Sequence, residues 1–207
     1  MHWFDCFELA CRNTLGHQIA CINSGNGGDS TVDLLRRIER DCLAHHPDIA
    51  FITIGGNDSH PNNGISVTAY RDNLRHIIRQ IQACDCHPVV QTYYACDLAA
   101  MPPPQAAAFV EMMEAARELS CELACMLIDH LTRWQRLQKS HSDSYRGLML
   151  DAMHVNGTGN LVLGLDIARA FSLSLPDDPY FHDARTTQAL LDELASAELS
   201  PEGAVCR

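Results

Sequence analysis

The stretch "FITIGGNDSHPNNG", Phe51 to Gly64, decides the fold. It begins with apolar, β-favouring residues and breaks off at two glycines, an asparagine and an aspartate, which is typical of a buried strand that runs into a loop. The strand itself is expected over Asp48 to Ile54. Because ligands of open α/β sheets bind beyond the carboxyl ends of the strands, the residues of this loop are candidates for chemistry.

Strand-like runs and amphipathic helices alternate along the rest of the chain. Further strands are expected at residues 17–23, 87–94 and 125–130, and helices at residues 30–46, 67–84, 105–124 and 157–173. This alternation predicts a three-layer α/β/α sandwich, with a parallel sheet covered by helices on both faces. Residues 1–175 form the expected domain, and residues 176–207 form a C-terminal tail with one exposed helix from Arg185 to Leu199.

Composition excludes several classes of protein. Fifteen Lys and Arg against 26 Asp and Glu give a net charge of -11, which would repel a nucleic-acid backbone. No uncharged apolar run is long enough to predict a membrane span. The ten cysteines are scattered and do not form a disulfide framework, so reduced thiols and a cytoplasmic location are expected.

A glycine-rich loop, "NSGNGGDST" from Asn23 to Thr31, precedes the first long helix after a predicted strand. Its glycines allow a sharp turn that exposes backbone N–H groups at a helix N-terminus, where an anion or oxyanion is favoured. The alternative is an ordinary tight turn between a strand and a helix. The loop does not match the nucleotide-binding motifs, so a nucleotide site is not predicted.

Two further loops contain candidate catalytic side chains. In "GGND", Asn57 can present its side-chain amide as a donor to a developing oxyanion, although an Asn-Asp pair also forms turns; Asp58 and Ser59 are expected to shape this turn. In "LMLDAMHVNGTGN", Asp151 lies three residues before His154. At this spacing a carboxylate can orient an imidazole as a general base, although the pattern also arises by chance.

Taken in order, the three loops resemble those of the SGNH, or GDSL, hydrolase family. The resemblance spans Trp3 to Phe171 and implies a flavodoxin-like fold and ester hydrolysis through an acyl-enzyme. It implies that Gly28 and Asn57 form the oxyanion hole, and that Asp151 and His154 complete a Ser-His-Asp triad.

The same resemblance implies a small ester substrate, with an acyl, lipid or carbohydrate component. His60, which follows the "GGNDS" segment, is expected to contact that substrate. No cofactor and no metal are expected, and no oligomeric state is predicted.

The family's nucleophile motif is missing from its usual place. That motif is Gly-Asp-Ser at the end of the strand before the glycine-rich loop, whereas residues 1–16 resemble the helix that follows it. The sole Gly-Asp-Ser, Gly28 to Ser30, opens a helix and is interpreted as an N-cap. We therefore expect the first strand and the serine to lie upstream of Met1, and the chain as given to be inactive. The alternative is a binding protein that has lost its nucleophile.

Thiol chemistry offers two other hypotheses. A zinc site would draw its ligands from Cys84, Cys86, His87 and Cys96, but their spacing does not fit the usual pairs of zinc ligands. A cysteine nucleophile would need a strand-to-helix turn, whereas Cys6 and Cys11 lie on a predicted helix and are interpreted as packing residues.

Overall fold

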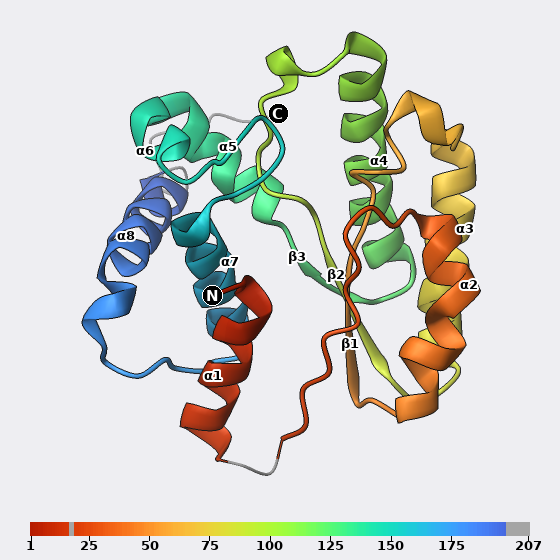
Figure 1. Cartoon of the computed structure of the whole chain (residues 1–207), viewed down its shortest axis with the longest axis horizontal. Coiled ribbons are helices and arrows are strands. Elements are labelled where there is room, and N and C mark those ends of the chain that lie inside the picture. Colours follow the sequence, from red (N-terminus) through yellow and green to blue (C-terminus); the bar gives the residue numbers. More distant parts are fainter. Residues whose placement is uncertain (17–18, 198–207) are drawn as a thin grey trace, which may run out of the picture. The chain divides into compact units, whose positions relative to one another are not determined.

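The computed structural model describes residues 1–16 and 19–197, and the chain divides into two compact units. Residues 24–130 form the first, called here the sheet unit, because it contains the three strands (Figure 1). The described residues within 1–23 and 131–207 form the second, called here the helical unit. The two predicted loops that contain Gly28 and Asn57 belong to the sheet unit, and the Asp151–His154 loop belongs to the helical unit.

The sheet is parallel, and its strands follow the order β1-β2-β3. The strands are β1 (Ile49–Thr53), β2 (His87–Gln91) and β3 (Met126–Ile128). Phe51 pairs with Val89, and Val89 pairs in turn with Met126. The strands predicted over residues 48–54, 87–94 and 125–130 are therefore confirmed, and their carboxyl ends meet at one edge.

Three long helices pack beside this sheet. They are α2 (Thr31–Asp41), α3 (Val67–Gln82) and α4 (Pro103–Glu122), and short 3-10 helices lie at η1 (Leu43–His45), η2 (Pro61–Asn63) and η3 (Leu98–Ala100). Helix α3 lies between α2 and α4 and contacts both (Figure 1). The apolar faces of α3 and α4 are buried. Their buried side chains are Leu74, Ile77, Ile78 and Ile81 in α3, and Phe109, Met112, Met113 and Leu119 in α4. Apolar burial on this scale is the main stabilising contribution to such a core.

The strand predicted at residues 17–23 is wrong over the part that the structure describes. Residues 19–23 have an extended course without strand pairing, and the side chain of Ile22 is 53% exposed. An apolar, β-branched run becomes a strand only where a neighbouring strand satisfies its N–H and C=O groups. Residues 19–23 have no such neighbour among the described residues, and His17 and Gln18 lie outside them.

The helical unit is built around α7. Its elements are α1 (Trp3–Leu15), α5 (His130–Ser140), α6 (Ser142–Arg146), α7 (Gly157–Ala170), η4 (Pro179–Phe181) and α8 (His182–Ala197). Helix α1 packs against α7 so closely that a Cβ atom on Gly164 would lie 2.5 Å from the Cβ of Cys6. Cys6 and Cys11 are both buried, which confirms their interpretation as packing residues. Helices α5 and α6 were not predicted.

The sequence predicted an exposed helix in the C-terminal tail. Helix α8 instead packs on α7 and is buried along part of its length. Ala184 and Leu191 are fully buried. Arg133 of α5 donates from Nε to the Asp166 carboxylate of α7 at 3.2 Å and from its terminal nitrogen to Asp192 of α8 at 2.5 Å. Burial raises the pKa of Asp166, and the arginine between the two carboxylates offsets part of that cost. Residues 198 and 199 of the predicted helix lie outside the described residues.

Candidate active site

The glycine-rich loop ends at a well-formed helix start. The Ser30 N–H and hydroxyl donate to the Asp33 carboxylate at 3.0 and 2.6 Å, and this capping box opens α2. These two hydrogen bonds lower the pKa of Asp33, the one from the hydroxyl contributing most. Ser30 is only 5% exposed. The interpretation of this serine as an N-cap is confirmed.

Gly28 holds a conformation that favours glycine. Its φ is +95°, and a Cβ atom there would meet no other atom within 4 Å, so backbone strain and not crowding selects glycine. Within the described residues, its N–H has no hydrogen-bond partner. An unpaired N–H in a loop before a helix N-terminus is a suitable donor for an oxyanion.

The two glycines of the "GGND" loop are each required by their surroundings or their backbone conformation. Gly55 has a φ of +122°, whereas a Cβ atom on Gly56 would lie 2.7 Å from the hydroxyl oxygen of Tyr93. Burial raises the pKa of that tyrosine to about 12, so its hydroxyl stays protonated beside the loop. Ser59 closes the turn as predicted, because its N–H donates to the Gly55 carbonyl at 3.0 Å and its hydroxyl donates to the Gly56 carbonyl at 2.8 Å.

Asn57 joins this turn to the glycine-rich loop. Its side-chain Nδ2 donates to the carbonyl oxygen of Asp29 at 2.9 Å, and Asp29 directly follows Gly28. An amide nitrogen has two hydrogens, so this bond fixes the orientation of the side chain and leaves one N–H for a ligand. The structure thus brings Asn57 to the residue next to Gly28.

Asp58 makes a second connection between the same loops, and sequence reasoning missed it by assigning the residue only to the turn. The buried carboxylate accepts the Thr31 N–H at 3.0 Å and the Thr31 hydroxyl at 2.5 Å. Burial raises the pKa of Asp58, and the two Thr31 bonds oppose that rise. A carboxylate five residues after the end of β1 was the available signal, because a carboxylate complements the positive end of a neighbouring helix.

His60 lies at the surface of the loop that follows. It is exposed, and its Nδ1 accepts the Asn62 N–H at 3.3 Å as the cap of η2. Its backbone N–H donates to the Asn57 carbonyl at 3.1 Å. Its contact with substrate stays a prediction.

Asp151 and His154 form a hydrogen-bonded pair in the helical unit. Both carboxylate oxygens lie 2.9 Å from His154 Nδ1, and Oδ1 also accepts the N–H groups of Met153 and His154 at 2.8 Å. These contacts, the Met153 N–H first among them, lower the pKa of Asp151. The histidine side chain is 72% exposed, and its Nε2 has no partner within the described part of the chain. The carboxylate therefore orients the ring with Nε2 free to accept a proton.

A short hairpin fixes the loop that bears this pair. Met149 and Val155 form an isolated antiparallel bridge, and Asn156 follows directly as the N-cap of α7. The Asn156 side chain accepts the Gly159 N–H at 3.0 Å and donates to the Gly147 carbonyl at 2.7 Å. One asparagine thus ties the entry of the loop to the helix that follows it.

Metal chemistry finds no support in the geometry. Over residues 1–16 and 19–197, no three His, Cys, Asp or Glu side chains are grouped so that they could hold a metal ion. The zinc alternative raised by Cys84, Cys86, His87 and Cys96 therefore gains nothing from the structure.

In the described residues, no helix is long and apolar enough to cross a membrane.

Comparison with known sequences now places the chain. Residues 8–162 match the GDSL-like lipase/acylhydrolase family, which is most of the chain, so the protein belongs to that family and is a hydrolase acting on ester bonds. No curated protein matches the sequence significantly. The recognition made from the three loops is confirmed.

Solved structures share the fold. An acetyl xylan esterase, AlAXEase, superimposes with a TM-score of 0.72 at 20% identity, covering 82% of this chain and 90% of that one. The lipase/acylhydrolase from Enterococcus faecalis gives 0.67 at 24% identity, with 84% and 88% covered. Axe2, an acetylxylan esterase from Geobacillus stearothermophilus, gives 0.73 at 17% identity, with 86% and 84% covered. The predicted α/β fold of the SGNH hydrolases is confirmed.

Proposed function

We propose that this protein is a serine esterase of the SGNH type, which cleaves a small acyl ester in two steps through an acyl-enzyme. His154 removes the proton from the serine nucleophile and gives it to the leaving alcohol; it then removes a proton from water and returns it to the serine as the acid is released. Asp151 holds the imidazole and stabilises its charged form, and the Gly28 N–H and the Asn57 side chain bind the oxyanion.

The observation that carries the proposal is the Asp151–His154 pair. A carboxylate that accepts two backbone N–H groups and the imidazole Nδ1 fixes the tautomer of the histidine, which is what a general base requires. The Asn57–Asp29 bond supports the other half, because it orients an uncharged donor next to the unpaired N–H of Gly28.

The favoured substrate is an acetyl ester on a carbohydrate. This proposal is supported by two structural neighbours, AlAXEase and Axe2, both of which are acetyl xylan esterases. Acetylated xylo-oligosaccharides are therefore the first natural substrates to test, with p-nitrophenyl acetate as the general probe.

Ser30 is not available as the serine nucleophile. Its hydroxyl donates to Asp33 in the capping box, and its side chain is buried. This observation favours a second candidate function, a protein that binds esters or sugars without hydrolysing them.

One experiment separates the two functions. Hydrolysis of p-nitrophenyl acetate is measured for the 207-residue chain and for a product that also includes the codons directly upstream of Met1, each with a His154→Ala control. Activity that falls about 10³-fold or more in the control supports the esterase. If neither folded product is active, the binding protein is favoured, and binding of the same oligosaccharides is measured by calorimetry. Activity in the shorter chain would assign the nucleophile to one of its own residues.

A further inference from the structure

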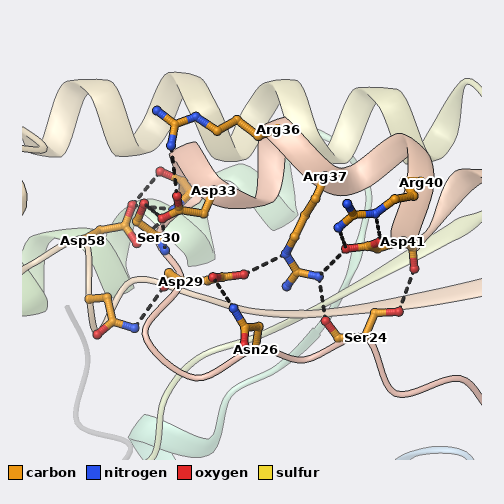
Figure 2. Close-up of polar contacts among 12 residues, drawn as sticks. Ser24, Asn26, Asp29, Ser30, Asp33, Arg36, Arg37, Arg40, Asp41 and Asp58 are labelled. Atoms are coloured by element: carbon orange, nitrogen blue, oxygen red, sulfur yellow. Dashed lines mark hydrogen bonds and ion pairs between the residues drawn. The ribbon is translucent and has the colours of Figure 1, made fainter.

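Arg37 of α2 reaches back across the glycine-rich loop and contacts both of its ends. Its Nε donates to Asp29 Oδ2 at 2.7 Å, and a terminal nitrogen donates to the Ser24 carbonyl at 2.7 Å and to Asp41 at 3.1 Å (Figure 2). Its side chain is 17% exposed, and that of Asp29 is 13% exposed. A charge pair so well shielded from solvent is stronger than the usual surface ion pair.

Asp29 transmits this contact to the proposed oxyanion donors. Its other carboxylate oxygen accepts the Asn26 side chain at 2.8 Å, so the carboxylate is held from two sides. Its carbonyl accepts the Asn57 side chain at 2.9 Å, and its peptide nitrogen is bonded to Gly28. The position of Asp29 therefore sets both the orientation of the Asn57 side chain and the position of the carbonyl end of Gly28.

The glycine-rich loop contains three glycines, and hydrogen bonds hold it at Ser24, Asn26 and Asp29. Gly25, Gly27 and Gly28 leave a large conformational freedom, and an oxyanion site works only when its donors are fixed before the reaction. We propose that Arg37 is a positioning residue for the oxyanion hole, which acts by holding Asp29 and the Ser24 carbonyl in place. This inference rests on the proposed function for its catalytic consequence, but not for the order that it predicts in the loop.

The neighbouring arginines on the same helix provide the contrast. Among the described residues, Arg36 pairs only with Asp33 one turn earlier, with its side chain 74% exposed, and Arg40 pairs only with the adjacent Asp41, with its side chain 79% exposed. Neither reaches the loop. Arg36→Met is therefore a matched control for Arg37→Met, with the same change of residue on the same helix.

The first measurement does not depend on activity. Amide ¹⁵N relaxation should give order parameters near 0.85 for Gly27 and Gly28 in the unchanged chain and in Arg36→Met, and values below about 0.6 in Arg37→Met. Asp29→Asn, which keeps the shape of the side chain and removes its charge, should loosen the same glycines and serves if Arg37→Met does not fold. Order parameters that are equal in all four proteins would overturn the proposal.

The second measurement uses the active esterase. Arg37→Met should lower kcat about 10- to 100-fold with KM changed less than about twofold, because the oxyanion forms only in the transition state. In an Asn57→Ala background the same substitution should lower kcat much less, since the two changes act on one site. Equal losses in both backgrounds would overturn the positioning role. An unchanged protein without activity would count against the proposed function alone, and the relaxation data would still decide on the loop.

Discussion

Asp58 of the "GGND" loop binds Thr31, the first residue of α2, which follows the glycine-rich loop. Its carboxylate accepts the Thr31 N–H at 3.0 Å and the Thr31 hydroxyl at 2.5 Å. The Asn73 side chain donates in turn to the Thr31 hydroxyl oxygen at 3.0 Å. Two loops that are far apart in the sequence are thus joined by a buried carboxylate beside the Asn57–Asp29 bond. These contacts join the proposed oxyanion site to the buried interior of the sheet unit.

Removing that carboxylate should destabilise the protein. Asp58→Ala leaves the buried N–H and hydroxyl of Thr31 without their acceptor, and we expect a loss of about 3 kcal/mol in the free energy of unfolding. Asp72→Ala is the control, because the Asp72 side chain is 67% exposed and its pairing with Arg75 is a contact of the kind that contributes about 0–1 kcal/mol. Urea unfolding measures both. Similar losses in the two variants would contradict the structural role of Asp58.

Gly56 should tolerate no side chain. In Gly56→Ala the new methyl group would lie 2.7 Å from the hydroxyl oxygen and 2.8 Å from Cζ of Tyr93, whose ring is held in the core against Phe109. Either the ring or the backbone that positions Asn57 must shift, so we expect a loss of about 1–3 kcal/mol in the free energy of unfolding together with a lower kcat.

The matched control for this substitution is Gly157→Ala. Gly157 is the first residue of α7, and a Cβ atom there would meet nothing within 4 Å. Its stability should stay the same or rise slightly, because alanine favours helix more than glycine does. A Gly56→Ala variant as stable as this control would show that Tyr93 moves aside at little cost.

Local sequence patterns predicted the elements of the sheet unit well. Apolar, β-favouring runs marked β1, β2 and β3, and the N-cap candidate Ser30 marked the start of α2. Periodicity also identified the buried face of α3. These signals are local, and the structure fulfils them because each pattern has a packed partner.

Contacts between distant segments were not predictable in the same way. Residues 19–23 have a strand-like pattern but no strand pairing in the described structure, and pattern alone does not specify a partner. Arg37 and Asp58 read as ordinary surface and turn residues until the fold brings them to Asp29 and Thr31. For the helical unit, Asp151 and His154 were found because their pairing is local, whereas the Arg133 contacts that bury α8 join three helices.

Asn156 should couple the stability of α7 to the geometry of the Asp151–His154 pair. Asn156→Ala removes the cap on Gly159 and the bond to the Gly147 carbonyl, and we expect a loss of about 1–2 kcal/mol in the free energy of unfolding. Ser66→Ala removes a comparable cap, since Ser66 accepts the Ala69 N–H at 3.1 Å at the start of α3.

The two cap variants should differ in function more than in stability. The Ser66 variant should keep the esterase kcat of the unchanged protein, whereas the Asn156 variant should lose activity because the His154 loop is no longer tied at its base. Thermal unfolding and initial rates at saturating substrate are measured side by side. Equal kcat values in the two variants would mean that the hairpin alone holds the pair.

The titration of Asp151 tests the pair directly and needs no substrate. Its pKa is lowered first by the Met153 N–H and then by His154, so ¹³C NMR should find its carboxyl midpoint below the ordinary value of 3.8. Because the folded-state pKa is depressed, the bonds that the carboxylate makes are fully present above the ordinary value and are lost as the pH falls through the lowered midpoint. In His154→Ala the midpoint should rise but stay below 3.8, since the backbone donors remain. A return of the midpoint to 3.8 in that variant would make His154 the main partner of the Asp151 carboxylate. The backbone N–H groups of the turn would then contribute little to holding the carboxylate in place.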